Sequence, residues 1–103
     1  MKVEVSPKAR ADIIRQFRYY LVTQEVPHVA VRFRKAVFET IEDLRRNYRI
    51  GKPVVEVRVG MRSWPVRGFE SIRLYYRDTS NGLCVVRILH GAQNVRRILA
   101  REK

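Results

Sequence analysis

"SIRLYYRDTSNGLCVVRILH", residues 71–90, predicts a pair of adjoining β-strands. In its first part, 71–77, apolar and charged side chains alternate, as they do in a strand that has only one buried face. The segment 78–82, DTSNG, ends in Asn-Gly and predicts the turn between the strands. On the first strand, alternation gives two sets of side chains: Ile72, Leu74 and Tyr76 on one face, and Arg73, Tyr75 and Arg77 on the other.

The second strand, 83–90, is apolar on both faces. One face can pack against the helices that the rest of the chain supplies. The other face stays partly bare as a binding surface, unless the C-terminal segment, another chain or the domain itself covers it. The residues leave these alternatives open. Strict alternation divides the strand into Cys84, Val86 and Ile88 on one face and Leu83, Val85, Arg87 and Leu89 on the other.

Two amphipathic helices are predicted, at 7–24 and at 28–49, and together they form an antiparallel hairpin. Ser6 offers an N-cap, Pro7 suits the first helical turn, and Gly51 ends the second helix. The two apolar stripes are Ala9, Ile13, Phe17, Tyr20 and Leu21, then Ala30, Phe33, Val37, Ile41, Leu44 and Tyr48. We expect four of these side chains to form the contacts of the hairpin with itself and with the sheet: Phe17, Leu21, Phe33 and Val37.

Shorter segments complete the predicted fold. Residues 3–5 and 62–66 are short strands, and Pro65 places the latter at an edge or a strand end. The segment 54–59, VVEVRV, is β-prone but ambiguous, and 92–103 is a C-terminal helix. The prediction is therefore an α+β domain, in which a small antiparallel sheet is packed by an N-terminal helical hairpin, with a short C-terminal helix.

Length and charge limit the class of protein. The 103 residues suffice for one domain, 1–103, and 22 Lys and Arg against 10 Asp and Glu give a net charge of +12. Such a charge implies an anionic partner: nucleic acid, a phosphate-rich assembly or an acidic protein. The lone cysteine, Cys84, has apolar neighbours and is expected to be buried in a reducing, cytoplasmic environment. We expect no signal peptide and no membrane role, because residues 1–10 contain no long apolar run and no stretch approaches about 18 apolar residues.

The corner "RILHGAQNV", residues 87–95, is either a nuclease site or a protein-binding surface. A metal-free ribonuclease needs a general base, a general acid and cations for the phosphate. The cations are plentiful: Arg58, Arg62, Arg73 and Arg87. However, the only histidines, His28 and His90, lie in different elements without an acidic partner at motif spacing. We therefore predict no catalytic residue, no metal site and no cofactor.

The order of elements resembles the RelE/ParE superfamily of bacterial toxin–antitoxin toxins, and three motifs carry the resemblance. "SPKARADI" at 6–13 is similar to the start of the first toxin helix. "RSWPVRGFESIRLYYRD" at 62–78 is similar to the ParE pattern of Arg-Ser, an aromatic residue, Pro, a Gly-aromatic pair and the central strand. "VVRILHGAQNV" at 85–95 is similar to the ParE signature around His-Gly-Ala. The resemblance, which includes the order of elements, covers nearly the whole chain.

The corner separates the two branches of the superfamily. RelE-type toxins, which cut mRNA in the ribosome, typically place a basic residue soon after the corresponding glycine and a Tyr or His further on. Here Ala92, Gln93 and Asn94 follow Gly91, and no Tyr or His follows at all. The ParE resemblance implies a toxin that inhibits DNA gyrase by binding. The alternatives are a ribosome-dependent mRNA endonuclease and a plain nucleic-acid-binding protein. Gln93 and Asn94 depart from the ParE pattern "HGARD", which raises the question of a shifted target.

The resemblance also implies two partners, gyrase and an acidic ParD-like antitoxin that folds on the toxin. A +12 surface attracts an acidic chain at long range. The residues expected to contact the target are Arg87, His90, Gln93, Arg96, Arg97 and Arg101. Those expected to contact the antitoxin are Arg18, Tyr20, Arg34, Trp64, Arg73 and Tyr75.

Overall fold

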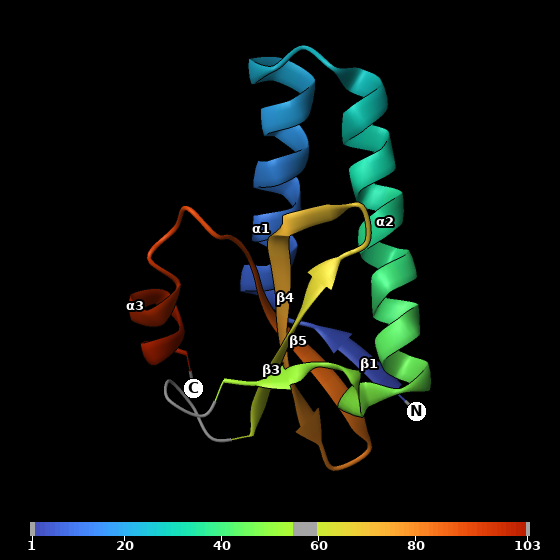
Figure 1. Ribbon diagram of the computed structural model, residues 1–103, viewed down its shortest axis with the longest axis vertical. Coiled ribbons are helices and arrows are strands. Elements are labelled where there is room, and N and C mark those ends of the chain that lie inside the picture. The colour runs from blue at the N-terminus through green and yellow to red at the C-terminus, as the bar shows by residue number, and fades with distance from the viewer. Residues whose placement is uncertain (1, 55–59, 103) are drawn as a thin grey trace.

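The computed structural model describes residues 2–54 and 60–102. A long pair of helices covers one face of a sheet and extends well beyond it, while a short third helix lies on the other side (Figure 1). Among the helices of the described residues, none has the length and apolarity needed to cross a membrane. In chain order the elements are β1 (Lys2–Val5), α1 (Pro7–Arg18), the π-helical turn η1 (Tyr19–Thr23), α2 (Pro27–Arg46), the 3₁₀ turn η2 (Tyr48–Ile50), β2 (Lys52–Pro53), β3 (Met61–Val66), β4 (Phe69–Thr79), β5 (Gly82–His90) and α3 (Val95–Ala100).

The predicted helical hairpin is confirmed. Ser6 Oγ accepts a hydrogen bond from the backbone N–H three residues further on, at 3.0 Å, and so caps α1. The helix continues into η1, which extends it almost to the predicted end at residue 24. Glu25, with a φ of 53°, reverses the chain before α2. α2 ends at Arg46 rather than at residue 49, and the turn η2 follows it.

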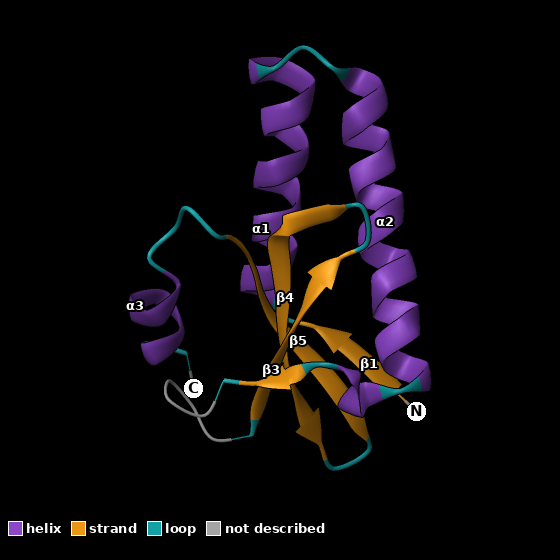
Figure 2. Ribbon diagram, viewed as in Figure 1, coloured by secondary structure: helices purple, strands orange, loops and turns teal. Residues whose placement is uncertain are grey.

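The strands, which are orange in Figure 2, form one five-stranded sheet. Their order in the sheet is β1-β5-β4-β3-β2. β3, β4 and β5 form the predicted antiparallel meander, but β1 pairs parallel with β5, so the expectation of a purely antiparallel sheet is wrong at this edge. The reason is the connection. Short turns join antiparallel neighbours, whereas the helical hairpin carries the chain from β1 to the opposite edge of the sheet. β1 is thereby left beside the last strand.

Two local predictions need adjustment. The turn between β4 and β5 is tighter than 78–82, because Thr79 pairs with Gly82. α3 covers only residues 95–100 of the predicted 92–103, since the Asn94 side chain accepts from the Arg97 N–H and caps it there. The ambiguous segment 54–59 lies outside the described residues except for Val54. Pro65 lies next to the end of β3, as predicted, and beyond Arg62 and Ser63, which are the residues of β3 that pair with β2 in the described part of the chain.

The main core lies between the hairpin and the sheet. Phe33 and Val37 are fully buried there, as expected, and Phe17 is half-buried. Leu21 is 40% exposed, so its predicted place in the interface is wrong. It follows the start of the widened turn η1, which shifts the helical period. Tyr20 packs inward in its place, with its ring centroid 5.7 Å from that of Phe33.

A second, smaller core lies on the opposite face of the sheet. A register shift pairs Tyr75 with Arg87 but Tyr76 with Val85, so Val86 is an extra residue in β5. The strict alternation predicted for 83–90 is therefore wrong beyond this bulge: Ile88 joins the hairpin side and Leu89 the other side. α3 covers that other face with Leu99. β5 is thus an internal strand, and the domain itself covers both of its faces.

Candidate functional site

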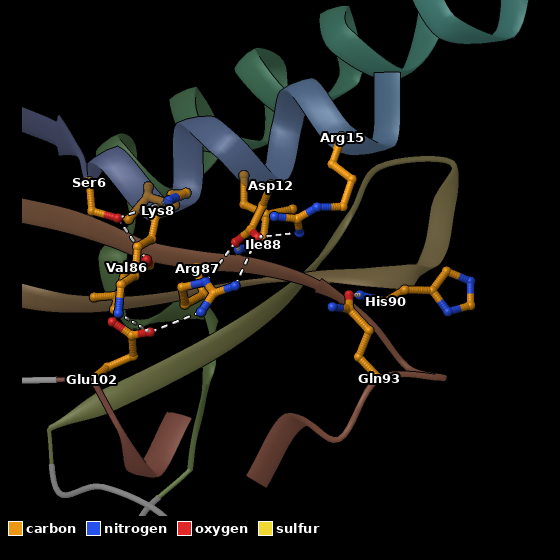
Figure 3. Close-up of polar contacts among 12 residues, drawn as sticks. Ser6, Lys8, Asp12, Arg15, Val86, Arg87, Ile88, His90, Gln93 and Glu102 are labelled. Carbon is orange, nitrogen blue, oxygen red and sulfur yellow. Dashed lines mark hydrogen bonds and ion pairs between the residues drawn. The ribbon is translucent and has the colours of Figure 1, made fainter. Parts of the chain in front are cut away.

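The corner after β5 is closed by its own side chains. The His90 N–H donates to Gln93 Oε1 at 2.8 Å, and the Ala92 N–H donates to His90 Nδ1 at 3.0 Å. Because Nδ1 accepts, the neutral imidazole carries its proton on Nε2, and that N–H is the group left to meet a partner. Figure 3 shows the His90 ring directed away from the body of the corner. His90 and Gln93 therefore shape the backbone here, with only part of each side chain left for binding.

Shallow hollows separate this corner from the hairpin. One, of about 510 Å³, is bordered by His90, Tyr19 and Gln16. A second, of about 320 Å³, is bordered by the same three residues together with Gln93. The hairpin and the corner thus form a continuous, uneven surface that contains amide, phenol and imidazole groups.

Arg87 lies largely inside the protein. Its side chain is 13% exposed, and both Nε and Nη2 donate to the Asp12 carboxylate, at 2.8 and 2.9 Å. Nη1 donates to Glu102 Oε1 at 2.9 Å. The hydrogen bonds to Asp12 raise the pKa of the Arg87 guanidinium; burial opposes this shift and Glu102 adds to it. Arg87 is one of the residues predicted to contact the target. In the structure, all three nitrogens of its guanidinium donate to internal partners, so little of the side chain is left for a target.

The other residues predicted to contact the target follow one another along the surface. Arg96, Arg97 and Arg101 are exposed on or just after α3, while Leu99 is buried beneath them. This confirms the predicted amphipathic arrangement of the helix. Together with Gln93 and the half-buried His90, they form a basic strip, which we define as the α3 surface: His90, Gln93, Arg96, Arg97 and Arg101.

Among the described residues, no general acid and general base lie together at this surface. His28 lies exposed at the start of α2, in a different element from His90. In residues 2–54 and 60–102 no cluster of three His, Cys, Asp or Glu side chains could hold a metal ion. Burial raises the pKa of the Cys84 thiol and also that of the Tyr75 phenol, so neither group is activated as a nucleophile or base at neutral pH.

The six residues predicted to contact the antitoxin do not form one surface. Trp64 packs against the core on the hairpin side of the sheet, whereas Tyr75 is buried in the core on the other side. Arg73 is half-buried and donates to Ser63 Oγ at 3.1 and 3.3 Å. Tyr20 packs into the main core. Only Arg18 and Arg34, both on the hairpin, are exposed.

A different surface on the hairpin fits a protein partner better. Ile14, Val31 and Phe38 are 57%, 62% and 53% exposed, which is unusual for side chains of this size. They line two adjacent hollows of about 550 and 370 Å³ between α1 and α2, and Arg34 and Phe38 border both. We call this surface the hairpin groove, and it consists of Arg10, Ile14, Phe17, Val31, Arg34, Lys35, Phe38, Glu39 and Glu42.

Sequence reasoning missed the hairpin groove and Asp12. The groove had a signal: Ile14, Val31 and Phe38 are large apolar residues that fall off both predicted core stripes. Asp12 had one too, because it is an acid between the stripe residues Ala9 and Ile13 on a helix otherwise rich in arginine. Its partners Arg87 and Glu102 are far away in the sequence, so the pairing itself had no local signal.

Comparisons with known proteins place this geometry in a family. The family model described as "ParE toxin of type II toxin-antitoxin system, parDE" matches residues 3–95. No curated protein matches the chain. A solved structure titled "Chromosomal ParDE TA system from P. aeruginosa" is similar, with a TM-score of 0.74 at 19% identity over 87% of this chain and 95% of that chain. At that identity the likeness shows the fold, while the family match spans nearly all of the sequence. The chain belongs to the ParE toxin family of type II toxin–antitoxin systems.

Proposed function

We propose that this toxin inhibits DNA gyrase by binding it through the α3 surface, without a chemical step of its own. The observation that carries the proposal is the corner itself. His90 and Gln93 are engaged with the backbone, Arg87 is paired internally, and the exposed groups that remain are arginines on a short helix. Such a surface supplies charge and hydrogen bonds for recognition. Family membership directs the choice of target towards gyrase.

The target is tested with purified components. The wild-type chain should block supercoiling of relaxed plasmid by gyrase in a concentration-dependent way. It should leave mRNA intact in a translation extract and should not shift free DNA at physiological salt. Cuts in mRNA at the ribosomal A site, with normal supercoiling, would identify the endonuclease alternative instead. A salt-sensitive shift of free DNA, without gyrase inhibition, would identify the nucleic-acid-binding alternative.

The hairpin groove is the proposed site of the antitoxin. Covering the exposed side chains of Ile14, Val31 and Phe38 stabilises a complex by roughly 25 cal/mol per Å² of apolar surface removed from water. Three basic residues, Arg10, Arg34 and Lys35, lie beside them. The two acids of the groove, Glu39 and Glu42, are paired with arginines outside it, so the basic residues favour an acidic partner. An amphipathic, acidic segment that becomes helical on binding has both the apolar face and the negative charge that this groove requires. Burial of its apolar side chains offsets the conformational entropy that the segment loses when it folds.

The antitoxin site is tested by two matched substitutions of exposed apolar residues. Phe38→Ser, in the groove, should weaken binding of the cognate acidic antitoxin by roughly tenfold or more, as expected for an apolar residue at the centre of an interface. Val22→Ser, which alters a 67% exposed side chain in η1 outside the groove, should leave the affinity unchanged. Equal affinities for both variants, measured by calorimetry, would exclude the groove.

A further inference from the structure

Asp12 is the only acidic residue of α1, and it is almost completely buried, with 3% of its surface exposed. It does not line the hairpin groove. It faces the other way, towards β5, where Figure 3 shows it between the helix and the strand. A buried carboxylate is costly unless its oxygens are hydrogen-bonded and its charge is paired, so its partners explain why it is tolerated there.

Asp12 completes the edge of β5. β1 pairs with β5 only as far as Val5 opposite Val85, after which the chain turns into α1. Beyond that point side chains replace the missing strand. Ser6 Oγ donates to the Val86 carbonyl at 2.7 Å, and Asp12 Oδ2 accepts from the Ile88 N–H at 2.9 Å. The backbone groups that an edge strand leaves open are therefore occupied by the helix.

Asp12 also fixes Arg87. The two side chains form a bidentate pair, in which the planar guanidinium has one favoured orientation against the carboxylate. In that orientation the remaining Nη1 reaches Glu102, whose carboxylate also lies 3.5 Å from Lys8 Nζ. One buried acid thus connects α1 to the end of β5 and, through Arg87, to the segment after α3.

This connection matters because α3 is short and its apolar contact with the sheet is small. The helix has six residues: Leu99 is buried, and Val95 and Ile98 are partly buried against the smaller core. These contacts hold the helix on the sheet, and the corner at 90–94 and Glu102 anchor its two ends. Both ends lie next to groups that Asp12 orders: Ile88 precedes the corner, and Arg87 binds Glu102.

We propose that Asp12 is a positioning residue for target binding, which acts through Arg87, Ile88 and Glu102 to hold the α3 surface in its binding orientation. The proposal rests on the proposed role of that surface in target contact. It separates two functions on one helix: the groove side of α1 serves the antitoxin, and the Asp12 side serves the target.

Four variants of the full chain test this role. Asp12→Asn removes the charge with little change of shape, and Asp12→Asn/Arg87→Gln removes both charges, so that no unpaired ion stays buried. Glu102→Gln removes the charge that pairs the segment after α3 with Arg87 and Lys8, and it leaves the contacts of Asp12 in place. The control is Asp43→Asn, which breaks the 2.6 Å ion pair between α2 and Arg67, another connection between hairpin and sheet.

Three quantities are measured at a temperature where every variant is folded: inhibition of gyrase, affinity for the antitoxin, and amide exchange of residues 88–93 relative to β4. We expect Asp12→Asn and the double variant to lose inhibition by about tenfold or more, equivalent to about 1.4 kcal/mol. Their antitoxin affinity should stay within a factor of about two, and exchange at 88–93 should accelerate selectively. Glu102→Gln should lose less, and Asp43→Asn nothing.

Three results would overturn the proposal: unchanged exchange at 88–93 in both Asp12 variants, faster exchange with full inhibition, or parallel losses of inhibition and antitoxin affinity. The last result would mean that Asp12 merely stabilises the whole fold. If the wild-type chain itself fails to inhibit gyrase, the proposed target is wrong, and growth arrest in cells replaces inhibition as the functional readout for the same variants.

Discussion

The two faces of the sheet are covered in very different ways. On one face the long hairpin packs against a deep core that contains Phe33, Val37 and Tyr76, and it still exposes apolar side chains to solvent. On the other face a six-residue helix is held by Leu99, by the partly buried Val95 and Ile98, and by one buried ion-pair network, and it exposes arginines. The first face has apolar surface to offer a partner, and the second has charge.

This difference teaches how one small domain can serve two partners. A rigid platform with unburied apolar residues suits a partner that orders itself on contact, because the toxin loses little entropy of its own. A lightly held charged helix suits recognition of a preformed surface, since charge gives orientation and a fast association rate. The free energies of local opening should therefore differ between the two faces.

The largest effect is expected beneath the hairpin groove. Phe33→Ala should lower the free energy of unfolding by about 3 to 5 kcal/mol, because it opens a cavity at a fully buried position. Phe38→Ala, on the same helix but 53% exposed, should cost less than about 1 kcal/mol. Urea unfolding measures both values. Similar losses for the two would show that Phe38 contributes to the core as Phe33 does, and that the groove is not a free surface.

Leu99→Ala tests the other face. Removal of a buried leucine usually costs about 2 to 5 kcal/mol, and we expect the low end here because a short helix can detach without unfolding the sheet. Amide exchange should accelerate in α3 far more than in β4. If the whole domain instead lost protection uniformly, α3 would be an integral part of one cooperative unit.

Tyr76→Phe examines the polar side of the main core. The Tyr76 hydroxyl donates to the Tyr48 carbonyl at 2.6 Å and accepts from the Gly51 N–H at 2.9 Å, so its loss leaves a buried N–H and carbonyl without partners. A cost of about 1 to 3 kcal/mol is expected. A melting temperature equal to that of the wild type would contradict these contacts.

The smallest effect belongs to an exposed pair at the same hairpin. Asp43→Asn breaks the ion pair with Arg67, whose side chain is 57% exposed, and should cost about 0.2 to 1 kcal/mol, less at high salt. A loss above about 2 kcal/mol in thermal or urea unfolding would mean that surface charge, and not the apolar core, holds the hairpin to the sheet.

Much of the fold, and less of the candidate site, could be predicted from the sequence, and the features that could not be predicted share a physical cause. The helical hairpin and the strands 71–77 and 83–90 follow from local periodicity, so they were predictable. The parallel pairing of β1, the bulge at Val86 and the pairing of Asp12 with Arg87 depend on contacts between distant segments, which no local pattern reports. The only sequence signal for the hairpin groove was a set of large apolar residues, Ile14, Val31 and Phe38, that lie outside the two predicted core stripes.

The separation of the two surfaces is tested most directly by adding antitoxin to a gyrase reaction inhibited by each of three toxins. Wild type should inhibit supercoiling, and the antitoxin should restore it. Phe38→Ser should inhibit equally but resist rescue, whereas Arg96→Ala/Arg97→Ala should fail to inhibit and still bind the antitoxin with wild-type affinity. Full inhibition by the double arginine variant, or normal rescue of Phe38→Ser, would contradict the assignment of target and antitoxin to opposite faces of the sheet.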